Sequence, residues 1–163
     1  MLTSKSIGAG LLCLAIAGCG GGVGPFKDVL VCLHNREEVQ EYKGFLEQYA
    51  SSNKLTYTDN TDTRLALALK HDRNEYEQHV GGQYLYSVME SGDGFSFLIS
   101  NWDHSETTIA HSFITTADLE PGEVLADNFL TVVESKWEVI ELPVKEMHTP
   151  QTCEDARALN NET

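Results

Sequence analysis

The chain has 163 residues, of which 41% are hydrophobic and 22% are charged, proportions that are ordinary for a globular domain with a sizeable core. Its formal net charge of −14 argues against binding to nucleic acid or to anionic lipid headgroups, because both attract cationic surfaces. The charge favours a basic protein partner through electrostatic steering, although solubility alone explains the same charge.

The first 18 residues have the layout of a secretory signal peptide. A short polar stretch with Lys5 is followed by an apolar run from Ile7 to Ala17 and by small residues before Cys19. The apolar run is too short for a helix that spans a hydrocarbon core of about 30 Å, which needs roughly 20 residues. The sequence therefore predicts a cleaved export signal and no transmembrane helix at this position.

The residues Ile16-Ala17-Gly18-Cys19 resemble the lipobox of bacterial lipoproteins. The resemblance implies cleavage after Gly18, diacylation of the Cys19 sulfur, and acylation of the new amine with a fatty acid such as palmitate. Two or more acyl chains give stable membrane anchoring. Because Gly20 and not Asp follows the cysteine, the resemblance implies the outer membrane of a Gram-negative envelope, with the domain facing the periplasm. The alternative is an ordinary signal peptide and a free Cys19.

Two cysteines remain once Cys13 leaves with the signal and Cys19 is lipidated. In an oxidising compartment Cys32 and Cys153 are naturally interpreted as one disulfide. The loop-entropy model assigns such a bridge about 4 to 5 kcal/mol. The alternative is that Cys32 is a buried thiol, because it lies in an apolar run.

The first half of the chain alternates strand and helix patterns after a short glycine-rich tether. The continuous apolar run Val29–Leu33 predicts a strand buried on both faces. Helical spacing of apolar residues predicts an amphipathic helix over Arg36–Ala50, and alternation predicts a strand over Leu55–Thr58. The segment Arg64–His71 combines the period of a strand with the Ala and Leu content of a helix, and helix is the favoured interpretation.

The second half contains the clearest strand pair, Tyr84–Glu90 and Phe95–Trp102, which Ser91–Gly94 joins as a tight hairpin. Three further elements are predicted: a short strand over Ile109–Ile114, an amphipathic helix over Val124–Ser135, and a last strand over Trp137–Leu142. The polar C-terminal segment is predicted to be an extended arm.

This order predicts an α+β fold, with a single antiparallel or mixed sheet and two main helices packed on one face. A ferredoxin-like arrangement with an insertion fits the order. The predicted organisation is a lipoprotein signal peptide over 1–18, a lipidated cysteine and tether over 19–27, an α+β domain over 28–143, and a polar C-terminal arm over 144–163.

The sequence contains no motif of known catalysts or metal sites. Its six histidines form no HExxH signature and its cysteines no CxxC pair, a GxSxG elbow is missing, and 25 acidic residues make any one carboxylate pair uninformative. We therefore expect no enzymatic activity, no catalytic residue, no metal and no cofactor.

One region has the composition of a protein-binding surface. Acidic residues are mixed with aromatic residues between positions 59 and 90, and the 91–103 region could lie nearby. Exposed aromatic residues among acids suit a basic protein surface. The candidate partner-binding residues are Asp59, Asp62, Asp72, Glu75, Tyr76, Asp93, Trp102 and Asp103. The alternative is an insertion with a solvated face.

The leading functional hypothesis is a membrane-anchored periplasmic lipoprotein that acts as a non-catalytic protein-binding module. Within that class, an immunity-type inhibitor of a toxin or envelope hydrolase matches the lipobox, the size, the acidity and the disulfide-capable pair. Two alternatives stay open: a structural or assembly accessory lipoprotein of an envelope or secretion complex, and an envelope hydrolase. The sequence identifies neither the partner nor the oligomeric state.

Overall fold

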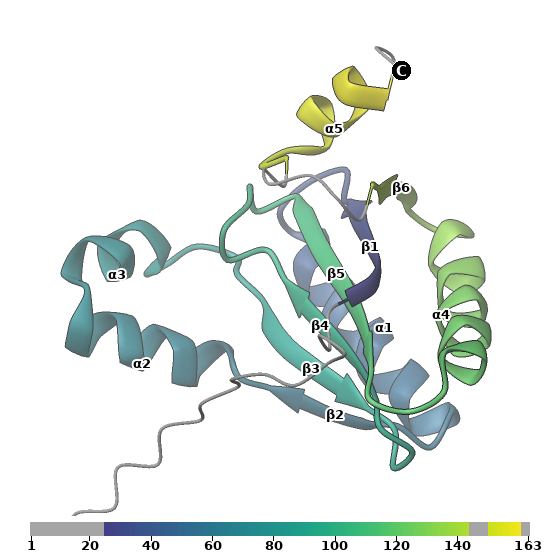
Figure 1. The fold of residues 1–163 in the computed structure, drawn as a ribbon. Helices are drawn as coiled ribbons and strands as arrows, with labels where there is room; N and C mark the ends of the chain where they lie inside the picture. Colours follow the sequence, from purple (N-terminus) through teal and green to yellow (C-terminus); the bar gives the residue numbers. More distant parts are fainter. Residues whose placement is uncertain (1–24, 144–149, 161–163) are drawn as a thin grey trace, which may run out of the picture.

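The computed structural model describes residues 25–143 and 150–160 (Figure 1). The predicted signal peptide, the lipidation residue Cys19 and the glycine-rich tether up to residue 24 lie outside the described residues, as do positions 144–149 and 161–163. The elements in chain order are β1 (Pro25–Cys32), α1 (Glu38–Ser52), β2 (Thr56–Asp59), α2 (Thr61–His71), α3 (Arg73–His79), β3 (Tyr86–Glu90), β4 (Phe95–Ser100), β5 (Thr108–Thr115), α4 (Leu119–Glu134), β6 (Glu138–Leu142) and α5 (Cys153–Asn160).

Six strands form one sheet in the order β2-β3-β4-β5-β1-β6, and every neighbouring pair is antiparallel. The strands from β2 to β5 make a meander, whereas α1 and α4 connect strands that are not neighbours. Helix α4 joins β5 to β6 across β1, and α1 joins β1 to β2 across three strands. These two split β-α-β connections resemble the ferredoxin-like pattern with a longer meander. The predicted α+β fold is confirmed.

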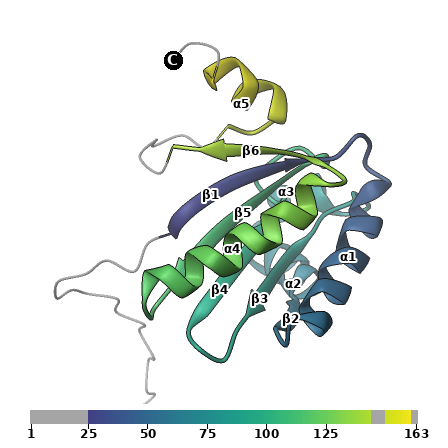
Figure 2. The same cartoon turned by 90° about the vertical axis from the view of Figure 1, so that its right-hand side faces the viewer.

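Helices α1 and α4 cover one face of the sheet (Figure 2), where the main core lies. Alternation along each strand sends every second side chain to this face, so β4 and β5 contribute Phe97 and Phe113. Their rings contact Phe129 of α4, with centroids 5.0 and 6.2 Å away. Tyr42 and Leu46 of α1 are likewise fully buried. Each such side chain contributes about 1.5 to 3 kcal/mol.

Helix α5 packs on the opposite face, over β1 and β6 (Figure 1). A smaller buried cluster joins Leu30 and Ile140 of the sheet to Ala156 of the helix. Cys32 and Cys153 form a disulfide across a sequence separation of 121 residues, so α5 is bonded covalently to the end of β1. This pairing is the one that the sequence predicts.

The structure corrects two predictions, the conformation of the C-terminal arm and the end of the tether. The arm over 144–163 is predicted to be extended, but Cys153–Asn160 form α5. Thr152 caps this helix, because its Oγ1 accepts the Asp155 amide (3.1 Å), and the same hydroxyl donates to Asp155 Oδ2 (2.7 Å). The tether is predicted to reach residue 27, but residues 25–27 belong to β1, where Pro25 and Lys27 pair with β5.

A helical arm made of α2 and α3 is inserted between β2 and β3 and projects from the sheet (Figure 1). Helix α2 agrees with the favoured interpretation of the Arg64–His71 segment. Helix α3 begins after Asp72, whose carboxylate accepts the backbone amides of Asn74 and Glu75. Arg64 of α2 donates to Glu75 of α3 at 2.5 Å, which joins the two helices.

Candidate functional site

The face of the sheet that carries α5 is also where the candidate site lies. The strand register places Leu98, Ser112, Asp28 and Leu142 in one row across β4, β5, β1 and β6. Within that row the Ser112 hydroxyl donates to Asp28 Oδ1 at 2.5 Å. A half-buried carboxylate therefore lies on β1 between Ser112 of β5 and Leu142 of the edge strand β6.

A cavity of about 390 Å³ lies between these strands and α5. This volume is within the range of about 300 to 1,000 Å³ that ligand sites occupy. The strands contribute Pro25, Asp28, Val29, Tyr86, Leu98, Ser100, Ala110, His111, Ser112 and Leu142, the loops contribute Asp103, His104, Pro143 and Pro150, and α5 contributes Ala156, Leu159 and Asn160.

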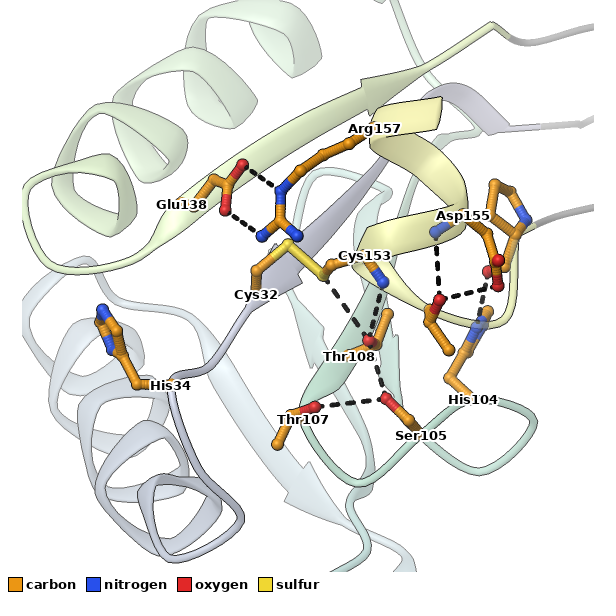
Figure 3. Close-up of a disulfide and its surroundings, with 12 residues drawn as sticks. Cys32, His34, His104, Ser105, Thr107, Thr108, Glu138, Cys153, Asp155 and Arg157 are labelled. Atoms are coloured by element: carbon orange, nitrogen blue, oxygen red, sulfur yellow. Dashed lines mark hydrogen bonds and ion pairs between the residues drawn. A yellow bond between two sulfur atoms is a disulfide. The ribbon is translucent and has the colours of Figure 1, made fainter. Parts of the chain in front are cut away.

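The charged side chains that line this cavity have one sign. Asp28 and Asp103 both line it, and the lining contains neither Lys nor Arg. In the described part of the chain, Arg157 of α5 is turned to Glu138, to whose carboxylate its Nε and Nη2 donate at 2.9 and 2.5 Å (Figure 3). The cavity therefore suits a cationic or hydrogen-bond-donating group with an apolar stem.

His104 adds a neutral hydrogen-bonding group to the cavity wall. Its Nδ1 donates to the Pro150 carbonyl oxygen at 3.1 Å. Burial lowers the pKa of His104 and outweighs the Pro150 carbonyl and the charge of Asp103, which act in the opposite direction. At neutral pH the ring is therefore uncharged, and with the proton on Nδ1 its Nε2 is an acceptor.

A second, more open hollow of about 490 Å³ lies on the other side of Asp103 and His104, which line both cavities. Its remaining lining comes from α3, the α3–β3 connection, the β4–β5 loop and the residues before α5: Glu75, Gln78, His79, Tyr84, Trp102, Ser105, Gln151 and Thr152. The loop and the start of α5 are joined by hydrogen bonds around Ser105 and Thr108 (Figure 3). The two hollows therefore adjoin along a connected wall.

Trp102 is the centre of an aromatic cluster at this hollow, and it is buried, with 3% of its surface exposed. Its Nε1 donates to Glu75 Oε1 at 2.7 Å, and His79 stacks on the ring with centroids 4.1 Å apart. The Arg64 guanidinium lies 5.3 Å from the ring centroid. The expectation that Trp102 is an exposed contact residue is wrong, because the α2–α3 arm covers it.

The predicted partner-binding residues are only partly brought together. Glu75, Trp102 and Asp103 meet at the second hollow. Tyr76 lies on α3, half-buried and outside the lining of both cavities. Asp93 lies in the β3–β4 turn, at the opposite end of β4 from Trp102.

The other three predicted acids have local roles. Asp59 forms an ion pair with Lys43 and accepts the Thr61 amide at 2.9 Å. Asp72 caps α3, and Asp62 lies in the first turn of α2. These carboxylates therefore belong to the end of β2 and to the arm, and they do not line either cavity.

Sequence reasoning missed Asp28, Ser112 and His104 as a set. Asp28 and Ser112 are 84 positions apart, and only the register of β1 against β5 places them side by side. The one local signal is a charged residue just before the apolar run of β1, in a strand predicted to be buried on both faces.

Within the described residues, no three His, Cys, Asp or Glu side chains are grouped as metal ligands would be. None of the helices in the described ranges has both the length and the apolarity that a bilayer crossing requires. Comparison with protein-family models, with curated proteins and with solved structures finds no match.

Proposed function

We propose that this protein is a lipid-anchored, non-catalytic binding module of the bacterial envelope that receives a basic protein partner in the cavity beneath α5. Of the protein-binding roles, that of an immunity-type inhibitor is preferred. Such a protein protects its own cell by occluding a toxin or envelope hydrolase. The anchor is inferred from the lipobox-like residues Ile16–Cys19.

The single observation that carries this proposal is the chemistry of the cavity. Its charged side chains are Asp28 and Asp103, and its apolar walls include Leu98 and Leu142. A partner side chain with a cationic head and an aliphatic stem matches both features, because Lys and Arg bury their stems along apolar surface. Charge pairs in such settings contribute to specificity and to association rate.

The charge of the whole chain supports the same class of partner. Removal of the predicted signal peptide takes away Lys5, so the formal charge changes from −14 to −15. A field of this sign attracts basic proteins and raises their association rate, most strongly at low ionic strength. The cavity then supplies the local contact that selects among basic surfaces.

The test is affinity capture from an envelope and secreted-protein extract with three immobilised mature proteins: unchanged, Asp28→Asn and Asp93→Asn. Both variants remove one negative charge, but Asp93 lies in the distant hairpin turn. We expect Asp28→Asn to lower the affinity for the captured partner at least tenfold, and Asp93→Asn to change it less than twofold. Equal losses in the two variants would show that only net charge matters and would refute the site.

A second measurement separates the inhibitor from an assembly subunit. The partner's hydrolytic or toxic activity is measured with increasing amounts of this protein. An inhibitor abolishes the activity at a stoichiometric ratio, and Asp28→Asn requires at least tenfold more protein. An integral membrane partner without such activity, captured at high salt, would instead assign the protein to an envelope assembly.

A further inference from the structure

The two cavities form one interrupted groove. Asp103 and His104 line both hollows and separate the one beneath α5 from the one beside α3. The first hollow reaches from Asp28 on β1 to Tyr86 on β3, which is three strand spacings, or about 14 Å. An elongated site of this kind suits a chain segment better than a compact molecule.

The polar groups of the groove accept hydrogen bonds at several separate points. Asp28 presents a carboxylate beside the Ser112 oxygen, and Asp103 presents a second carboxylate beside the neutral His104 ring. Glu75 is already engaged by Arg64 and by the Trp102 indole. Recognition of a cation therefore falls to Asp28 and Asp103, in the first hollow and at its border.

We propose that the occupant of this groove is an extended peptide segment of the partner, with an arginine side chain seated on Asp28 and the following residues crossing Asp103 and His104 into the second hollow. This inference rests on the proposed function and names the chemical group that the site recognises, a guanidinium. A segment of about five extended residues spans roughly 17 Å, which exceeds the about 14 Å of the first hollow and leaves residues that can enter the second.

Arginine fits these acceptors better than lysine. A guanidinium has five N–H donors in a planar fork, whereas an ammonium has three donors at one point. Two of these donors can pair with the single carboxylate of Asp28, which the Ser112 hydroxyl already contacts through Oδ1, whereas an ammonium offers only a point charge. The apolar side chains of Leu98 and Leu142 then cover the methylene stem.

The test uses pools of synthetic seven-residue peptides whose central position is arginine, lysine or citrulline and whose other positions are mixed. Retention on the immobilised mature protein is measured at physiological salt. We expect the arginine pool to be retained at least tenfold more than the citrulline pool, which has the same shape without charge, and about threefold more than the lysine pool. A dipeptide amide of arginine and tyrosine should be retained less than the seven-residue pool.

Three protein variants complete the experiment. Asp28→Asn should abolish most of the preference for arginine over citrulline, Asp103→Asn should reduce it, and Asp93→Asn should preserve it. Thermal unfolding of each variant shows that the protein is folded. Equal retention of the arginine and citrulline pools by the unchanged protein would overturn the inference, as would an unchanged preference in Asp28→Asn.

These outcomes are distinguishable from a failure of the proposed function. If a basic partner is captured in a manner that depends on Asp28 while no peptide pool is preferred, the partner binds through a folded surface, and the inference alone is wrong. If the arginine pool is retained but capture of the protein partner is insensitive to Asp28→Asn, the groove binds arginine but is not the site at which the inhibitor contacts its partner.

Discussion

The hydroxyl oxygen of Tyr42 lies 2.7 Å from Nε2 of His111, and neither side chain has any exposed surface. Tyr42 is on α1 and His111 is on β5, so this hydrogen bond joins the helical layer to the middle of the sheet. Within the described residues, Nδ1 of His111 has no hydrogen-bond partner. Burial lowers the pKa of His111 to about 3, so the ring is neutral in the folded protein over most of the pH range.

This pair predicts that acid destabilises the fold. The unfolded chain protonates the histidine below about pH 6.5, whereas the folded protein does so only below about pH 3. Between these values the unfolded state binds more protons, so the free energy of unfolding falls by up to about 1.4 kcal/mol per pH unit as the pH decreases. Urea unfolding at several pH values measures this slope.

The matched variant is His111→Gln, which retains a polar group opposite Tyr42 but does not titrate. The slope between pH 6 and pH 4 should be smaller in the variant by about 1 kcal/mol per pH unit. His104, whose pKa burial also lowers, contributes to both proteins and cancels in the difference. Identical slopes in the two proteins would contradict the prediction.

Removing the disulfide should destabilise the protein mainly at its C-terminal helix. The bond between Cys32 and Cys153 restrains the unfolded chain over a long loop, and its loss should lower the free energy of unfolding by about 4 kcal/mol. In the variant with both cysteines changed to serine, backbone amides of α5 should exchange with solvent much faster than those of α1. Hydrogen exchange measured by mass spectrometry makes this comparison, and uniform acceleration would show that α5 is not a separate unit.

The hydrogen bond between Trp102 and Glu75 should contribute more to the free energy of unfolding than an exposed ion pair on helix α3, which also carries Glu75. Glu75→Ala leaves the buried indole N–H without its acceptor and should lower stability by about 2 kcal/mol. Glu77→Ala removes the exposed pair with Arg73 and should cost less than about 0.5 kcal/mol. Chemical unfolding followed by tryptophan fluorescence measures both, and equal effects would mean that the indole bond contributes little.

The lipobox-like residues predict a covalent anchor. Metabolic labelling with radioactive palmitate should label the unchanged protein and the Cys13→Ser variant but not Cys19→Ser. Cell fractionation should recover the first two with membranes and the third in the soluble fraction. Label in Cys19→Ser, or an unlabelled parent protein, would rule out the lipoprotein proposal.

Strand alternation made most of the sheet predictable. The hairpin of β3 and β4 and the apolar strand β1 were recognisable, because side-chain burial in them follows the local period. Helix α5 was missed because it has only eight residues and is polar on average. The capping residue Thr152, with Asp155 three positions later, was the available signal, and it marks the start of the helix.

The candidate site was much less predictable than the fold. Its central pair, Asp28 and Ser112, depends on the register between two strands that are distant in the sequence. The burial of Trp102 depends on its contacts with Glu75 and His79 of α3, and the local sequence pattern around Trp102 does not indicate them. Acidic residues that looked alike in the sequence divide in the structure into helix caps, ion pairs and cavity walls.

The direction of β1 has a consequence for how the molecule would stand on a membrane. The strand starts at Pro25, next to the predicted tether, and ends at Cys32, a rise of about 23 Å. The β4–β5 loop and the start of α5 lie at the Cys32 end, since Leu33 bonds to Thr107 and the disulfide is there. A lipid on Cys19 would therefore hold the opposite pole of the domain, and Asp103 and His104 would face away from the bilayer, towards arriving proteins.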